Sequence, residues 1–168
     1  MMEPLVGILM GSDSDLEVMM EAARVLDEFG IPYEIEITSA HRSPERTRRY
    51  AASAAKRGLK VLIVGAGGAA HLAGVLAAET TLPVIGVPLN SSPLNGVDAL
   101  YATVQMPAGV PVGTMAIGRA GATNAAVFAA EILATGDGDL RQKLVEYKKT
   151  LASKVESKSK ELRRKLKG

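Results

Sequence analysis

Apolar residues along this chain fall into two kinds of segment that alternate up to about residue 134. Short apolar or alternating runs of strand length are each followed by a stretch in which apolar residues recur at helical spacing. Because strands and helices alternate, the pattern predicts an α/β fold, a three-layer doubly wound parallel sheet with a flavodoxin-like strand order of 2-1-3-4-5. The five predicted strands are Leu5–Met10, Tyr33–Thr38, Val61–Val64, Pro83–Pro88 and Pro111–Ile117.

Residues that start and stop helices mark the segments between these strands. Ser14 followed by Glu17 fits a capping box for the first helix, which Gly30 ends. Ser43 is expected to be the N-cap of the second helix, with Pro44 at its first position. Further helices are predicted from near 69–72, at about 97–104 and at about 122–134.

The connection between residues 89 and 110 is long for a link between a strand and a helix. It contains the run Ser91-Ser92-Pro93, the short helix predicted at about 97–104, and Met106-Pro107. Loops of this length are usually functional or lie at a subunit contact, and we expect one of these two roles here.

The last 30 residues differ from the rest of the chain. Apolar positions from Asp139 onward repeat at helical period with lysine and arginine between them, which predicts a long C-terminal helix. Residues 1–138 carry a net charge of −5 and residues 139–168 carry +7. We therefore expect an α/β catalytic domain over 1–138 and a basic helical extension over 139–168 that is not a separate domain. Its narrow apolar stripe leaves two alternatives, packing along a neighbouring subunit or fraying.

The composition excludes several classes of protein. The 168 residues are 47% hydrophobic and 23% charged, which suits a globular chain with an ordinary core. Cysteine is absent, so a disulfide framework, a thiolate zinc site and a cysteine nucleophile are excluded, and a reducing cytoplasm is the expected location. No apolar run is long enough for a membrane span, and we expect neither a span nor a signal peptide.

The loop after the first strand, Gly11–Asp15, combines a glycine with hydroxyls and carboxylates. Ser12, Ser14 and the free N–H groups of the following helix can bind phosphate oxygens, and Asp15 can accept hydrogen bonds from ribose hydroxyls. The alternative is that Ser14 only caps the helix and the acidic residues favour its dipole.

The loop after the second strand carries one of two histidines in the chain, His41, next to Arg42. Ligands of open α/β sheets bind outside the carboxyl ends of the strands, where this loop is predicted to lie. Histidine transfers protons near neutral pH, and arginine binds phosphate or carboxylate, so the pair predicts an enzyme acting on a small anionic molecule. A surface or structural role for His41 is the alternative.

The loop after the third strand, Gly65–Ala70, matches the G-x-G-x-x-A form of a dinucleotide fingerprint. The acidic residue that should follow about twenty positions later is missing, since that region reads Val-Pro-Leu-Asn, and this disfavours dinucleotide binding. The glycines instead let backbone N–H groups approach a small planar group closely, with His71 just beyond. His71 is otherwise an ordinary histidine on a helix face.

These three loops, read together as GSDSD, SAHRSP and GAGGAAHL, resemble the PurE family, and the match continues through Gly86-Val-Pro88, Gly96-Val-Asp98, Gln105-Met-Pro107 and Pro111-Val-Gly113. The GGAAHL loop is similar to that of the bacterial mutase branch. The resemblance implies a cytoplasmic, cofactor-free and metal-free homo-octamer of de novo purine synthesis that interconverts N5-carboxyaminoimidazole ribonucleotide and 4-carboxy-5-aminoimidazole ribonucleotide.

A histidine can serve this chemistry alone, because one proton must reach nitrogen and another must leave carbon as the carboxyl group moves. We assign His41 as this acid and base. By resemblance, the ribonucleotide is bound by Ser12, Asp15 and Arg42 with Ser14 and Ser39, and the carboxylate or CO2 by Gly67, Gly68, Ala69, Ala70 and His71.

Two rival functions stay open at this point. One is a direct carboxylase of 5-aminoimidazole ribonucleotide (AIR) with the same fold. The other is a non-enzymatic module that binds nucleotides or nucleic acid through the basic tail. Aromatic residues, which stack on bases, make up only 4% of the chain, so we expect no nucleic-acid partner. The apolar runs are short, so we expect no membrane partner either.

Overall fold

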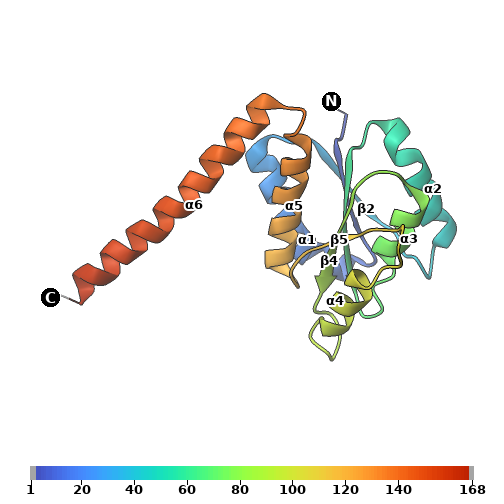
Figure 1. Ribbon diagram of the computed structural model, residues 1–168. Coiled ribbons are helices and arrows are strands. Elements are labelled where there is room, and N and C mark those ends of the chain that lie inside the picture. Colours follow the sequence, from blue (N-terminus) through green and yellow to red (C-terminus); the bar gives the residue numbers. More distant parts are fainter. Residues whose placement is uncertain (1–2, 167–168) are drawn as a thin grey trace. The chain divides into compact units, whose positions relative to one another are not determined.

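A computed structural model describes residues 3–166, so residues 1–2 of the predicted catalytic domain and residues 167–168 of the predicted extension lie outside it. The structure divides into two compact units, residues 1–129 and 130–168, which are described separately. The first unit contains a five-stranded sheet in the order β2-β1-β3-β4-β5, with every neighbouring pair parallel (Figure 1). The predicted fold and strand order are confirmed. The strands are β1 Val6–Met10, β2 Tyr33–Ile37, β3 Val61–Gly67, β4 Val84–Leu89 and β5 Gly113–Thr114.

Helices cover both faces of this sheet. On one face, α2, α3 and α4 pack on a core that includes Leu9, Leu62, Val64 and Leu76. On the other face, α1 lies beside the start of α5, where Arg119 pairs with Glu17 and Glu21. The helices of the first unit are α1 Leu16–Phe29, α2 Pro44–Ala54, α3 Leu72–Glu79, α4 Val97–Val104 and α5 Arg119–Leu133, the last of which continues into the second unit.

The parallel register determines where the loops after the strands lie. Ile8 in β1 is aligned with Ile35 in β2 and Ile63 in β3, and Ile63 is aligned with Ile85 in β4. β1, β3 and β4 are buried along almost their whole length, as continuous apolar runs predict. Since the strands run in one direction, the loops that follow them share one edge of the sheet.

The fifth strand is shorter than predicted. The sequence predicts a strand over Pro111–Ile117, but only Gly113 and Thr114 pair with β4. Pro111 has no N–H to donate to a ladder, and the chain leaves β4 soon after, where Met115 N still donates to Gly86 O at 2.9 Å. β5 is therefore a brief edge strand, and α5 begins soon after it.

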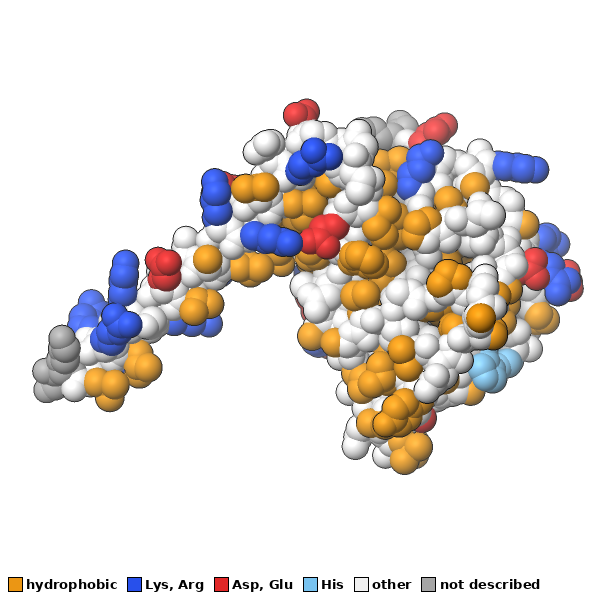
Figure 2. Space-filling model, viewed as in Figure 1, with side chains coloured by type: hydrophobic (Ala, Val, Ile, Leu, Met, Phe, Trp, Pro, Cys, Tyr) orange, Lys and Arg blue, Asp and Glu red, His pale blue; other side chains and the backbone are white. Residues whose placement is uncertain are grey.

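The second unit consists of the end of α5 and the long helix α6, Gly138–Lys165. Asp137 caps α6, because its Oδ1 accepts from Leu140 N at 3.0 Å. Leu140 and Leu144 are buried, whereas the apolar side chains of the later turns are exposed, with Val155 68% exposed. Figure 2 shows Lys and Arg side chains distributed along this helix. The predicted basic C-terminal helix is confirmed.

No helix within residues 3–166 combines the length and the apolar character needed to cross a membrane.

Candidate active site

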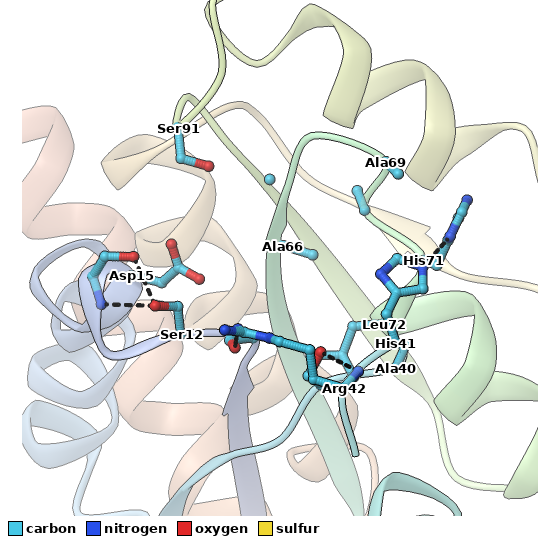
Figure 3. A pocket seen from close by; sticks show the side chains of 15 residues that line it. Ser12, Asp15, Ala40, His41, Arg42, Ala66, Ala69, His71, Leu72 and Ser91 are labelled. Carbon is cyan, nitrogen blue, oxygen red and sulfur yellow. Dashed lines mark hydrogen bonds between the residues drawn. The ribbon is translucent and has the colours of Figure 1, made fainter. Parts of the chain in front are cut away.

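A cavity of about 480 Å³ lies at the carboxyl edge of the sheet. Figure 3 shows Ser12, Asp15 and Ser91 on one side of it and the two histidines on the other, with Arg42 between them. The loops after β1, β2, β3 and β4 all contribute side chains. The lining residues are Gly11, Ser12, Ser14, Asp15, Ser39, Ala40, His41, Arg42, Ala66, Gly67, Ala69, Ala70, His71, Leu72 and Ser91.

The two histidines of the chain meet at one wall of this cavity. His41 Nε2 lies 2.7 Å from His71 Nδ1, and the rings meet edge to face with their centroids 4.9 Å apart. A hydrogen bond between two ring nitrogens needs a proton on one of them and a lone pair on the other. His41 Nε2 is therefore either a donor or an acceptor in this pair, and the two states differ by the position of one proton. Both rings are exposed to the cavity and to solvent.

Arg42 joins the second loop to the first. Its Nη2 donates to Gly11 O at 2.7 Å, across the ends of β1 and β2. Its backbone N donates to Ser39 Oγ at 3.1 Å. Arg42 lines the cavity, and a guanidinium has five N–H donors, so donors remain to bind an anionic ligand there.

Ser39 and Ser43 hold the histidine loop in shape. Ser39 N donates to Ser43 Oγ at 2.9 Å, and Ser43 Oγ donates back to Ser39 O at 3.2 Å. Ser43 is the N-cap residue of α2 and Pro44 is the first helical residue, as predicted, but the Ser43 side chain bonds back to the loop and makes no capping bond into the helix. Beneath them, the buried hydroxyls of Thr38 and Thr47 lie 2.8 Å apart. These hydrogen bonds hold the backbone of the loop that carries His41 and Arg42 in one conformation.

The first loop corrects one prediction. Ser14 does not cap α1, because a short 3-10 turn over Asp13–Asp15 precedes that helix and the residue at its N-cap is Asp15. Ser12 caps the 3-10 turn instead, accepting from Ser14 N at 3.3 Å, and Ser14 Oγ donates to Ser12 Oγ at 3.0 Å. The sequence of alternating serine and aspartate favours such a local turn over a capping box, because each short side chain reaches the backbone two residues away. Both serine hydroxyls line the cavity.

Asp15 is a buried acidic side chain at this edge of the sheet, 8% exposed. Burial, which disfavours the charged form, raises the pKa of its carboxyl above the ordinary value. The backbone N–H of Ser12 and, to a smaller extent, the side chain of Ser14 favour the charged form and oppose this shift, and Arg42 contributes a still smaller attraction. Asp15 lines the cavity, so its carboxyl can accept a hydrogen bond from a ligand there.

The third loop is a tight turn at the end of β3. Ala70 N donates to Gly67 O at 3.0 Å, and the turn places Gly68 at φ +58° and Ala70 at φ +45°. A non-glycine residue at positive φ is strained, and such positions concentrate at functional sites. Gly67, Ala69, Ala70 and His71 line the cavity, but Gly68 does not. All the other predicted site residues are brought together.

Sequence reasoning missed several lining residues. Gly11, Ala40, Ala66 and Leu72 come from the quoted motifs and contribute backbone or apolar surface. Ser91 is the one polar side chain among them, and it comes from the loop after β4. The length of the 89–110 connection was a signal for function there, but nothing in the sequence assigned Ser91 to the same cavity.

Within residues 3–166, no group of three or more histidine, aspartate or glutamate side chains is arranged to hold a metal ion. The absence of a cofactor remains a prediction from the sequence. The chemistry available at the cavity is proton transfer by imidazole and binding of anions by hydroxyl, guanidinium and backbone N–H groups.

Comparison with known proteins identifies close relatives. A family model described as AIR carboxylase matches residues 5–154. An N5-carboxyaminoimidazole ribonucleotide mutase of Pyrococcus horikoshii is 58% identical over 160 residues, which cover 95% of this chain and 89% of the relative. A phosphoribosylaminoimidazole carboxylase of Saccharomyces cerevisiae is 56% identical over 147 residues, 88% of this chain but 25% of that protein. The crystal structure of Treponema denticola PurE superimposes with a TM-score of 0.82 at 31% identity, covering 92% of this chain and 95% of that one.

Proposed function

The chain belongs to the AIR carboxylase family, the PurE family that its loops resemble, and we propose that it is an N5-carboxyaminoimidazole ribonucleotide mutase of purine biosynthesis. The Pyrococcus horikoshii mutase matches this chain along nearly the whole of both proteins, whereas the yeast carboxylase matches it over a quarter of its length. The mutase function is therefore better supported than direct carboxylation of AIR.

One observation carries the mechanism, the hydrogen bond of 2.7 Å between His41 Nε2 and His71 Nδ1 inside a cavity of about 480 Å³. Small-molecule sites have volumes of roughly 300–1,000 Å³, so the cavity suits a ribonucleotide. The histidine pair can hold a proton on either side of the contact, which is what a group that alternately gives and takes a proton requires.

The reaction is balanced by two proton movements. The bond between the exocyclic nitrogen and the carboxyl carbon breaks, CO2 is released into the cavity, and the nitrogen takes a proton. The electron-rich ring carbon then attacks CO2, a carbon–carbon bond forms, and that ring carbon loses its proton. His41 gives the first proton and takes the second, so the enzyme returns to its starting state without net proton uptake.

The remaining lining residues bind different parts of the substrate. Ser12, Ser14, Ser39 and Arg42 bind the phosphate and ribose of the nucleotide, and Asp15 accepts from a ribose hydroxyl. The backbone of the turn that contains Gly67, Gly68, Ala69 and Ala70, together with His71, holds the carboxylate and retains CO2. Gly68 contributes through the shape of the turn rather than by contact, since it does not line the cavity.

A comparison of substrates tests the function directly. The purified protein is assayed with N5-carboxyaminoimidazole ribonucleotide and, separately, with AIR plus bicarbonate. A mutase uses the carboxylated nucleotide far better at substrate concentrations in the micromolar range. Equal or better use of AIR with bicarbonate would favour the carboxylase alternative.

Among the described residues, 3–166, those that line the cavity all precede residue 92, so we propose that residues 1–138 form the catalytic domain and that 139–168 are an extension without catalytic groups. A protein truncated after Gly138 tests this and the rival nucleic-acid module together. The enzyme keeps its affinity for the ribonucleotide after truncation, even if its assembly changes. A module that used the basic tail would lose its binding.

We also propose a homo-octamer in the cytoplasm. Support for assembly comes from exposed apolar side chains at helical spacing on and before α4, namely Leu94, Val97, Tyr101 and Val104, of which Leu94 and Tyr101 are each 63% exposed. Figure 2 shows apolar side chains gathered on the surface in the region of α4. The cysteine-free composition agrees with a reducing compartment. Light scattering of the purified protein measures the mass, and a monomer would contradict the assembly.

A further inference from the structure

The Ser91 hydroxyl is a polar group of the cavity that the mechanism above leaves without a role. Ser91 follows β4 by two residues and lines the cavity with its side chain exposed. Four other serines at or beside the site, Ser12, Ser14, Ser39 and Ser92, use their hydroxyls in hydrogen bonds within the protein. No residue in the described range 3–166 forms a hydrogen bond with the hydroxyl of Ser91. It is therefore free to bind a ligand without first breaking a bond.

Gly67 places this hydroxyl against the third loop. A Cβ atom built on Gly67 would lie 1.8 Å from Ser91 Oγ and 3.2 Å from Ser91 Cβ. Gly67 is aligned with Leu89 at the ends of β3 and β4, so the two strands hold the contact in register. The hydroxyl thus occupies the space that a side chain at position 67 would fill. Figure 3 shows Ser91 directed into the cavity from the side opposite the histidines.

We infer that Ser91 binds the carboxyl group that is transferred in the reaction. This inference rests on the proposed mutase function. The hydroxyl adjoins the first residue of the Gly67–Ala70 turn, whose contribution to the cavity is backbone and methyl groups. A carboxylate there needs donors, and a hydroxyl supplies one that rotates freely about its C–O bond. By rotating, the Ser91 hydroxyl can therefore stay hydrogen-bonded to the carboxyl group while that group moves from nitrogen to carbon. Ser91 itself forms and breaks no covalent bond.

The test compares two ligands that differ by that carboxyl group. Ser91→Ala is prepared, and its affinities for the product 4-carboxy-5-aminoimidazole ribonucleotide and for AIR, which lacks the carboxyl group, are measured by calorimetry. A hydrogen bond to a charged group corresponds to about a ten- to hundredfold change in affinity. We expect a loss of that size for the carboxylated nucleotide and a change of less than about twofold for AIR, because AIR never made the bond.

Ser92→Ala is the matched control on the same loop. Ser92 Oγ donates to Asp98 Oδ1 at 2.8 Å, and this bond anchors the loop to α4. Loosening the loop alters the affinities for the two nucleotides by the same factor. If Ser92→Ala reproduced the selective loss, the effect of Ser91→Ala would be one of loop order and the assignment would be overturned.

The remaining outcomes separate the two proposals. An equal loss of both affinities in Ser91→Ala, or no loss of either, would overturn the role of Ser91 while the mutase activity of the unaltered protein stands. Failure of the unaltered protein to bind and convert the carboxylated nucleotides would overturn the proposed function, and the role of Ser91 with it.

Discussion

The two walls of the cavity consist of different chemical groups. The side-chain wall, made of Ser12, Asp15 and Arg42, presents hydroxyl, carboxyl and guanidinium groups that share many hydrogen bonds. The turn wall, made of the Gly67–Ala70 turn and the two histidines, presents backbone, small side chains and a pair of rings joined by one bond. Binding spread over several groups weakens gradually on substitution, whereas the proton transfer that we propose depends on one imidazole. The turn wall should therefore be the less tolerant of substitution.

The largest effect is expected on the turn wall at His41. His41→Asn removes the group that we propose as the proton-transfer residue but leaves the groups that we propose bind the nucleotide. Turnover should fall by about 10²–10⁴-fold, while the affinity for product stays within about a factor of ten. Steady-state kinetics and calorimetry with the product measure the two quantities.

His71→Asn is the control for that substitution. Its amide can still bond to His41, so its turnover should exceed that of His41→Asn. Near-normal turnover in His41→Asn would refute the assignment. A loss in His71→Asn as large as that in His41→Asn would contradict an acid and base role for His41 alone.

The next effect tests the close approach at Gly67. In Gly67→Ala the new methyl group overlaps Ser91 Oγ, so the turn or Ser91 must shift. A displacement of about 1 Å in an active site costs about 10² in rate, and kcat/KM should fall by that order. Gly68→Ala is the matched control, because a Cβ there meets nothing within 4 Å.

Gly68→Ala separates the effect of backbone strain in the turn from the effect of steric overlap with Ser91. Gly68 stands at φ +58°, so an alanine costs about 1–2 kcal/mol of stability without entering the cavity. Thermal unfolding of both variants accompanies the kinetics. Equal losses of kcat/KM in the two variants would show that strain in the turn, rather than the space over Gly67, limits activity.

On the side-chain wall, Arg42→Lys should have a moderate effect. Lysine keeps the charge but cannot bond to Gly11 O and to an anionic group with one planar fork. We expect about a tenfold weaker affinity for the nucleotide and little change in turnover at saturation, since about one charge-assisted bond is lost. Arg46→Lys, whose native side chain pairs with Glu36 at 2.6 Å outside this cavity, should change neither quantity. Unchanged affinity in Arg42→Lys would contradict its role.

The smallest effect on binding is expected at Asp15, together with a pH dependence of stability. Burial raises the pKa of Asp15 in the folded protein, so the folded state binds a proton at Asp15 more tightly than the unfolded state does. The stability that this proton binding contributes is complete below the unfolded pKa of about 3.9 and is lost as the pH rises through the folded pKa. Asp15→Asn should therefore be more stable than the native protein at pH 7, with the difference closing as the pH falls below about 4. Its affinity for the nucleotide should fall about three- to tenfold, because the asparagine amide oxygen still accepts the hydrogen bond but without the charge.

Unfolding by denaturant at several pH values measures the stability of this pair of proteins. A native protein that is more stable than Asp15→Asn at pH 7 would show that the hydrogen bonds from Ser12 and Ser14 outweigh the burial of the charge.

Much of the fold followed from local pattern. The apolar runs of β1 and β4 and the helical spacing of α4 and α6 predicted these elements closely, because buried strands and amphipathic helices leave clear periodicities. The capping box at Ser14 and the length of β5 were wrong, because each depended on which of several nearby hydrogen-bond partners the folded chain provides.

The sequence by itself determined the alternation of strands and helices, the loops that carry His41, Arg42 and Asp15, and the family to which the chain belongs. Only the tertiary structure decided that His41 and His71, thirty positions apart, share a hydrogen bond, and that Ser91 fills the space over Gly67. Sequence patterns report which face of an element is buried. Contacts between loops depend instead on the register of parallel strands, which hydrogen bonds between distant segments determine only when the chain is folded.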